Sequence, residues 1–220
     1  MLIIAAYIIY EQQVPFSERY HNETLAFQLR IDKNLVGPYA VFFGDSHIQG
    51  LAVQELNMPA INFGIGSDTS QGVLNRLSLY ESTNNALFIY LAVGFNDLKD
   101  RSNEKILLTF GKIIEGLPGD KPVFISLLPP IDEKVFRKVN VTNSRINRLN
   151  EALVKFQKTY NNVTIVNPGL KLIDSAGSLR KQYHIGDGVH LSPQGYAVMI
   201  DYLNQTFRQR SLINSDQRVF

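Results

Sequence analysis

The sequence contains no cysteine and carries little net charge, and these two shortages exclude several classes of protein. Without cysteine there is no disulfide framework, no thiol nucleophile and no thiolate metal site. The absence does not fix the compartment, because such a chain suits oxidising and reducing surroundings alike. The formal net charge is only +2, and no stripe of Lys or Arg stands out, so we expect no nucleic-acid partner.

Long apolar runs are also missing. Residues 1–10 are apolar, whereas a membrane-spanning helix needs roughly 20 such residues. The segment lacks the positive residues and the cleavage site of a signal peptide. Three interpretations stay open: the remnant of a membrane anchor, a degenerate signal segment, or an element packed on the domain. An anchor would associate with a membrane, and a periplasmic, extracellular or membrane-anchored location is favoured over a cytoplasmic one.

Length and composition fit a single domain. The chain has 220 residues, of which 45% are hydrophobic and 19% charged, and this ordinary balance allows a full core. No internal repeat, low-complexity tract or linker interrupts the sequence. We therefore expect one domain over residues 39–220, preceded by an apolar segment and polar lead-in over residues 1–38.

Continuous apolar runs alternate with segments of helical periodicity. Unbroken runs are typical of parallel strands that are covered on both faces. The expected strands are 39–43, 60–63, 86–93, 122–128 and 163–166, and the expected helices are 18–31, 69–80, 103–115, 142–160 and 193–207. Repeated strand–helix units predict an α/β protein: a doubly wound, three-layer α/β/α sandwich around a five-stranded parallel sheet.

Polar motifs follow several of these strands. The run 41–47 ends in Gly-Asp-Ser, which delivers Ser46 to the edge of the sheet where ligands of open α/β sheets bind. Segments 64–70 and 94–97 follow the next two strands, and segment 187–190 precedes the last helix. Because the carboxyl ends of parallel strands share one edge, we expect these segments to converge.

Together these segments supply the groups that acyl transfer from an ester requires. Ser46 would attack the carbonyl, His190 would move its proton, and Asp187 would orient the imidazole. The backbone N–H of Ser46, a backbone N–H at the Gly66–Ser67 turn and the amide of Asn96 are the candidate oxyanion donors. Such a mechanism needs no metal and no cofactor.

The same segments carry a family resemblance. They resemble, in order, the four signature blocks of the SGNH (GDSL-type) hydrolases, and the resemblance covers residues 39 to about 207. Segments 62–66 and 190–196 are similar to the thioesterase I and platelet-activating-factor acetylhydrolase branch. The resemblance implies a flavodoxin-like fold, no metal, and hydrolysis of esters or thioesters.

Two positions depart from the family pattern. Ser67 stands where the family has a glycine whose N–H serves the oxyanion hole, and we favour the Ser67 amide over that of Gly66. His47 stands where the family usually has leucine. It either lines the substrate pocket or, as we favour, is a buried and hydrogen-bonded residue of the first helical turn.

Structural interpretations compete with the catalytic ones. Ser46 alone is compatible with a helix N-cap, Asn96 with an Asx-turn, and Asp187 and His190 with a surface pair. We expect three other carboxylates to brace loops: Asp45, Asp68 and Asp97. The sequence reveals no partner for His21 or His184. Loop 129–140 is expected to be solvated, although Phe136 and Arg137 are reasonable substrate contacts.

The leading hypothesis is a serine esterase that forms an acyl-enzyme on Ser46. Its substrate would be a small ester, a lipid or an acylated carbohydrate. An O-acetyltransferase acting on sugar hydroxyls uses the same machinery and is the nearest alternative. A non-catalytic ligand-binding module is the hypothesis of a different class, because fold alone does not guarantee activity.

Overall fold

The structure is a computed structural model that describes residues 15–210. The apolar stretch 1–10, with its three interpretations, lies outside the described residues. Within residues 15–210, no helix combines the length and the apolar character that crossing a membrane requires.

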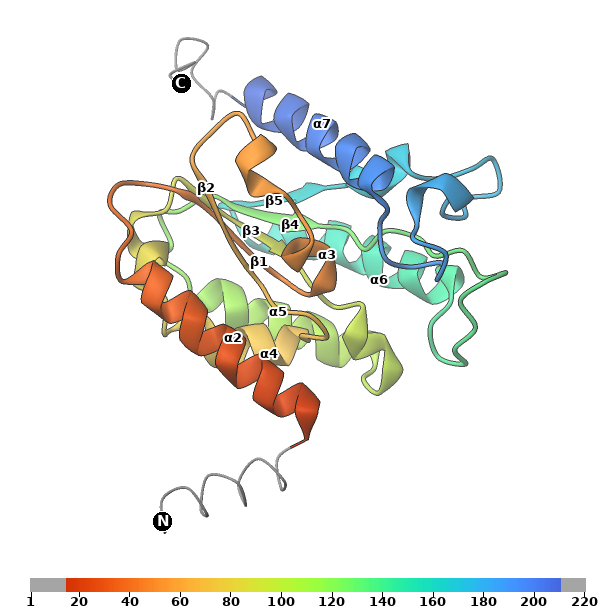
Figure 1. Cartoon of the computed structure of the whole chain (residues 1–220), viewed down its shortest axis with the longest axis horizontal. Helices are drawn as coiled ribbons and strands as arrows, with labels where there is room; N and C mark the ends of the chain where they lie inside the picture. Colours follow the sequence, from red (N-terminus) through yellow and green to blue (C-terminus); the bar gives the residue numbers. More distant parts are fainter. Residues whose placement is uncertain (1–14, 211–220) are drawn as a thin grey trace, which may run out of the picture.

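The centre of the molecule is a sheet of five parallel strands in the order β2-β1-β3-β4-β5 (Figure 1). This order is the flavodoxin-like one, so the predicted fold class is confirmed. The strands are β1 (Ala40–Gly44), β2 (Ala60–Gly64), β3 (Phe88–Ala92), β4 (Val123–Ser126) and β5 (Val163–Val166).

Helices cover both faces of the sheet. One face packs against α2 (Phe16–Asp32), α4 (Ser70–Leu77), α5 (Asn103–Glu115) and α6 (Asn143–Phe156). The other packs against α7 (Pro193–Gln209) and the short helix α3 (Ser46–Gln49) (Figure 1). The short 3-10 turns are η1 (Val53–Glu55), η2 (Glu81–Asn85), η3 (Asn96–Lys99), η4 (Gln157–Thr159), η5 (Pro168–Lys171) and η6 (Lys181–Tyr183).

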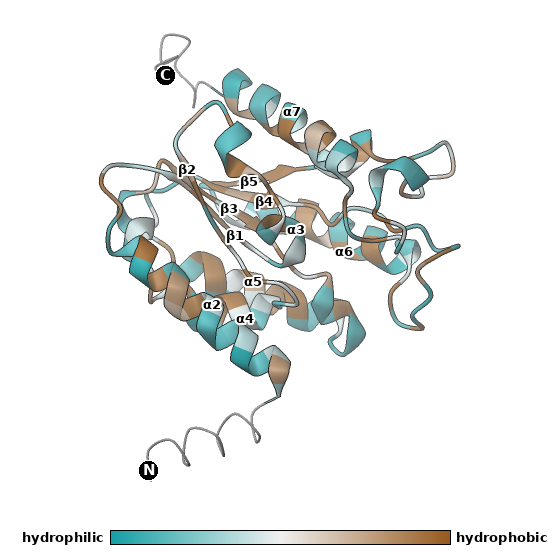
Figure 2. Ribbon diagram, viewed as in Figure 1, coloured by the Kyte–Doolittle hydropathy of each residue, from teal (hydrophilic) through white to brown (hydrophobic). Residues whose placement is uncertain are grey.

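The unbroken apolar strands follow from this double cover. In β1, Val41 and Phe43 face the α4–α5 side, whereas Ala40 and Phe42 face α7, and all four are fully buried. Phe207 of α7 packs on the aromatic side chains of the second face. Figure 2 shows apolar strands between helices whose outward surfaces are hydrophilic. Because helices cover both faces of the sheet, apolar and polar residues do not alternate along most of its strands.

Helix starts are set locally by capping side chains. Four helices begin directly after a Ser or Thr whose hydroxyl accepts a hydrogen bond from a backbone N–H of the first turn: Thr69, Ser102, Thr142 and Ser192. Helix α5 and strand β5 occupy the predicted ranges. Helix α4 ends three residues before the predicted Tyr80, and α6 ends at Phe156, where the chain tightens into η4.

A buried polar network joins α2 to the rest of the molecule. Gln28 of α2 donates to the carbonyl of Gly64 over 2.9 Å and accepts from the Tyr80 hydroxyl over 2.6 Å. The guanidinium of Arg76, 1% exposed, donates to Tyr80 and to the carboxylate of Asp68. A buried charge is tolerated only when it is paired in this way, so the network holds α2 at the end of β2.

Gly64 provides a test of how closely α3 packs on β2. A Cβ added at Gly64 would lie 2.3 Å from the Gln49 amide nitrogen and 2.8 Å from the Ile48 carbonyl carbon. Because both atoms are backbone, we expect Gly64→Ala to lower the free energy of unfolding by about 1–3 kcal/mol. Urea denaturation measures this. Gly119→Ala is the control, since an added Cβ there meets nothing within 4 Å. Equal stability of the two variants would contradict the close packing.

Candidate active site

The first three sequence motifs start from one edge of the sheet. Gly44, the last residue of β1, pairs with Gly64 of β2 and with Ala92 of β3. The three strands therefore end level with one another. The loops that carry Ser46, Ser67 and Asn96 leave the sheet side by side.

Ser46 is the first residue of α3 and is held by its neighbours. The carboxylate of Asp45 caps the helix by accepting from the His47 N–H over 3.0 Å, so the predicted bracing role of Asp45 is confirmed. On the other side, the Tyr196 hydroxyl donates to the His47 carbonyl over 3.1 Å. Burial raises the pKa of Tyr196 to about 12, so this hydroxyl keeps its proton.

His190 connects Ser46 to Asp187. Its Nε2 atom lies 3.1 Å from Ser46 Oγ, and its Nδ1 atom lies 2.5 Å from Asp187 Oδ2. The other oxygen of Asp187 accepts from the N–H groups of Val189 and His190, each over 2.9 Å. A carboxylate, an imidazole and a hydroxyl in this order are placed to pass a proton from serine to histidine.

The charge state of Asp187 suits this arrangement. Partial burial raises its pKa, but the hydrogen bonds from the His190 ring and from the Val189 and His190 amides outweigh burial and leave the pKa below its ordinary value of 3.8. Asp187 is therefore anionic at neutral pH and keeps the proton of His190 on Nδ1. Nε2 is then free to accept from Ser46. The side chains of His190 and Asp187 are 48% and 40% exposed, so the site is open to solvent.

Ser67 has an unusual backbone. With φ at +65°, it is the only non-glycine residue of positive φ among the described residues. It lies in a turn that the Asp68 N–H closes on the Ile65 carbonyl over 3.1 Å. The left-handed conformation costs roughly 1–2 kcal/mol for a residue with a Cβ. The glycine of the SGNH pattern at this position avoids that cost.

Asn96 spans the loops that follow β2 and β3. Its Nδ2 atom donates to the carbonyl of Asp68 over 3.0 Å, and its Oδ1 atom accepts from the Lys99 ammonium over 2.8 Å. Both contacts fix the amide orientation. The second N–H on Nδ2 is left as a donor beside the Ser67 turn.

Two further carboxylates brace these loops, as predicted. Asp97 accepts from the N–H and the hydroxyl of Ser70 and from the guanidinium of Arg101, over 2.6–2.8 Å. Asp68 pairs with Arg76 over 2.9 Å. Both carboxylates are buried. They stabilise the loops. Among the described residues, neither carboxylate makes a hydrogen bond or ion pair with Ser46.

His47 follows Ser46 in α3 and is buried. Its Nε2 atom donates to the Val189 carbonyl over 3.1 Å, and its Nδ1 atom lies 3.4 Å from Asp45. The ring stacks on that of His190 at a centroid distance of 6.0 Å. Burial lowers the pKa of His47, but the Asp45 carboxylate reverses this and raises it above 6.5. The favoured prediction, a buried and hydrogen-bonded histidine, is confirmed.

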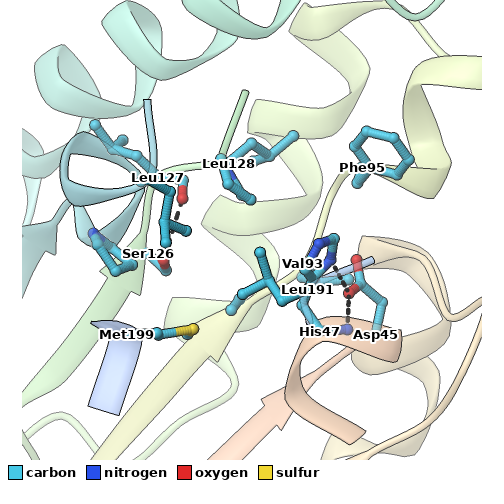
Figure 3. A pocket seen from close by; sticks show the side chains of 14 residues that line it. Asp45, His47, Val93, Phe95, Ser126, Leu127, Leu128, Leu191 and Met199 are labelled. Atoms are coloured by element: carbon cyan, nitrogen blue, oxygen red, sulfur yellow. Dashed lines mark hydrogen bonds and ion pairs between the residues drawn. The ribbon is translucent and has the colours of Figure 1, made fainter. Parts of the chain in front are cut away.

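His47 also lines an apolar cavity at the carboxyl ends of β3 and β4 (Figure 3). The cavity has a volume of about 30 Å³, which is room for a water molecule or two. His47 and Asp45 form one end of it, and the remaining wall is largely apolar, with Phe95, Leu128, Leu191 and Met199 among its members. Ser46 and His190 are not lining residues, so the cavity lies behind the nucleophile turn.

Several partners found in the structure were not evident from the sequence. His184 contacts Asp132, and His21 lies 3.8 Å from Asp68. The contact from Tyr196 to α3 joins residues 149 positions apart. Within residues 15–210, no three His, Asp or Glu side chains are grouped so that they could hold a metal ion.

The family assignment rests on sequence as well as geometry. The sequence profile of the GDSL-like lipase/acylhydrolase family matches residues 40–198. The chain belongs to the GDSL-like lipase/acylhydrolase family. This family accounts for the four sequence motifs and for the fold, and it identifies the protein as an ester hydrolase.

Solved structures share the fold of this GDSL-like hydrolase. A Streptococcus pneumoniae protein described as a platelet activating factor has a TM-score of 0.81 and 23% identity, covering 93% of this chain and 98% of its own. A GDSL-like lipase from Bacteroides thetaiotaomicron has a TM-score of 0.66 and 20% identity, covering 89% and 98%. A lipase/acylhydrolase from Enterococcus faecalis has a TM-score of 0.66 and 19% identity, covering 79% and 96%. Among curated proteins, none matches the sequence.

The raised pKa of His47 predicts how stability depends on pH. A histidine whose pKa is higher in the folded state contributes stability below its unfolded pKa of 6.5 and loses it as pH rises through the folded value. His47→Gln removes the titration and keeps a donor for Val189. We expect the stability advantage of wild type over His47→Gln to be largest near about pH 5.5 and to shrink above 6.5. Urea denaturation across this range measures it, and an advantage that grows with pH would contradict the assignment.

Proposed function

We propose that this hydrolase cleaves carboxylic esters through an acyl-enzyme on Ser46. The observation that supports this most is the connected set Asp187–His190–Ser46, with separations of 2.5 and 3.1 Å. Ester hydrolysis itself follows from the family. The role of each residue is the proposal.

In the first half-reaction, Ser46 Oγ attacks the carbonyl carbon while His190 Nε2 takes its proton. The tetrahedral intermediate then breaks the bond to the alkoxy oxygen. His190 gives the proton to that oxygen, and the alcohol leaves. The acyl group is now esterified to Ser46.

In the second half-reaction, His190 deprotonates a water molecule that attacks the acyl carbon. The bond to Ser46 Oγ breaks, and His190 returns the proton to that oxygen. The carboxylic acid leaves and Ser46 is regenerated. The solvent exposure of His190 supports this step, because water reaches the base directly.

The negative oxygen of each intermediate needs donors that are already in place. We assign this role to the N–H groups of Ser46 and Ser67 and to the side-chain amide of Asn96. Lys99 and the Asp68 carbonyl fix the orientation of that amide before substrate binds. Each donor of this kind is typically worth about 100- to 1000-fold in turnover.

We further propose that the acyl group is short. His190 and Asp187 are roughly half exposed, and the apolar cavity behind the nucleophile turn does not include Ser46 in its wall. A long acyl chain gains affinity only where apolar side chains cover it. An open site of this kind favours an acetyl or butyryl group on an alcohol of unrestricted size.

Replacing the nucleophile tests the mechanism. We expect Ser46→Ala to lower kcat for p-nitrophenyl acetate by on the order of 10⁴-fold or more without changing the melting temperature. Ser144→Ala, the same change at an exposed position of α6, is the control and should keep full activity. A fluorophosphonate probe should label Ser46 in the wild type. A folded wild-type chain that neither hydrolyses esters nor labels would instead support a non-catalytic binding role.

A panel of p-nitrophenyl esters from acetyl to palmitoyl tests the acyl length. We expect kcat/KM not to rise from butyryl to palmitoyl, because each uncovered methylene adds no binding energy. An acetylated sugar and an acyl thioester belong in the same panel to compare leaving groups. A preference for palmitoyl would refute the short-acyl proposal and leave ester hydrolysis standing.

A further inference from the structure

The loop that carries Asp187 and His190 is held by other parts of the chain. Gly186 and Gly188 flank Asp187 and have φ values of +108° and +79°, which side chains with a Cβ rarely adopt. A Cβ at Gly188 would lie 2.8 Å from the Asp132 carbonyl oxygen. The Asp132 N–H donates to the Gly188 carbonyl over 2.9 Å. The loop is therefore packed tightly and depends on its contacts for its shape.

His184 contacts this loop through one ring nitrogen. Its Nδ1 atom accepts from the N–H of Gly186 over 3.0 Å and from the N–H of Gly188 over 3.1 Å. These N–H groups belong to the two glycines on either side of Asp187: that of Gly188 is in the peptide group directly after Asp187, and that of Gly186 is one peptide group further away. The side chain of His184 is 1% exposed, so water does not replace either hydrogen bond.

This contact decides which ring nitrogen of His184 carries the proton. A nitrogen that accepts two N–H groups cannot also bear hydrogen, so the proton belongs on Nε2. Nε2 lies 3.5 Å from the carboxylate of Asp132. Among the described residues, Nε2 of His184 has no partner at a normal hydrogen-bond distance. The negative charge of Asp132 favours the Nε2–H tautomer in that position.

We propose that His184 is a positioning residue for Asp187: its bare Nδ1 fixes the N–H groups of the two glycines that flank this residue, and Asp132 selects the required tautomer. The inference rests on the proposed function of Asp187 as the acid that orients His190. His184 does not contact Ser46 or His190 through any hydrogen bond of the described residues. Its effect is transmitted through the backbone.

The expected size of the effect follows from geometry. If the two amides lose their acceptor, the peptide planes around Asp187 rotate, and its carboxylate moves relative to the His190 ring. Misplacing a catalytic group by about 1 Å costs roughly 100-fold in rate. His47 holds only the Val189 carbonyl, on the far side of Asp187, and does not substitute for His184.

Two substitutions separate positioning from a general structural role. In His184→Asn, the amide oxygen occupies the place of Nδ1 and accepts from both N–H groups, so kcat should stay within a few-fold of wild type. In His184→Gln, the polar atoms lie near the place of Nε2 and leave both amides without an acceptor. We expect kcat to fall by about 10- to 100-fold with little change in KM. Equal kcat for the two variants would overturn the proposal.

Nuclear magnetic resonance of the full chain labelled with ¹⁵N-histidine gives a readout that does not depend on activity. The wild type should show hydrogen on Nε2 of His184 and none on Nδ1, with the ring signal assigned through bonds from the backbone resonances of His184 in the wild type itself. Hydrogen on Nδ1 would overturn the proposal, even if neither variant folds. Wild type and Ser46→Ala are assayed in parallel, so an inactive wild type would refute the proposed function and leave the tautomer test valid.

Discussion

Parallel pairing of β1 with both β2 and β3 is the constraint on which the site depends. Gly44 lies opposite Gly64 on one side and Ala92 on the other, so three strands end level and three loops begin together. Backbone hydrogen bonds set this register, and apolar cover on both faces keeps a strand from slipping by one residue. The sheet thus places Ser46, the Ser67 turn and Asn96, although the residues inside the sheet take no part in the proposed reaction.

The loop of Asp187 and His190 has no such support, because it lies outside the sheet. Side chains hold it instead. His47 binds the Val189 carbonyl, and His184 binds the amides of Gly186 and Gly188. Three histidines therefore serve one site in different ways. Hydrogen-bond partners separate them: Asp45 favours the charged form of His47, two N–H groups require a bare Nδ1 on His184, and the exposed His190 is the proposed base.

Buried charges make the same loops costly to disturb. Asp68 pairs with Arg76 beneath the Ser67 turn, and Asp97 pairs with Arg101 beneath Asn96. Removing one member of a buried pair leaves an uncompensated charge, which typically costs about 3–5 kcal/mol. This bracing also accounts for the strained φ of Ser67, because a left-handed residue with a side chain persists only where its surroundings enforce it. Stability and the geometry of the proposed oxyanion donors thus depend on the same contacts.

The sequence by itself determined the features that depend on local chemistry. Unbroken apolar runs predicted five parallel strands, apolar residues at helical spacing predicted the helices between them, and the four motifs predicted the family. It did not reveal what His47, His184 or Tyr196 contact. The partner of His47 is 142 residues away, and that of His184 requires two glycines to turn the chain back on itself. Hydrogen bonds of this kind leave no periodic pattern in a sequence, because only the folded chain brings donor and acceptor within 3 Å.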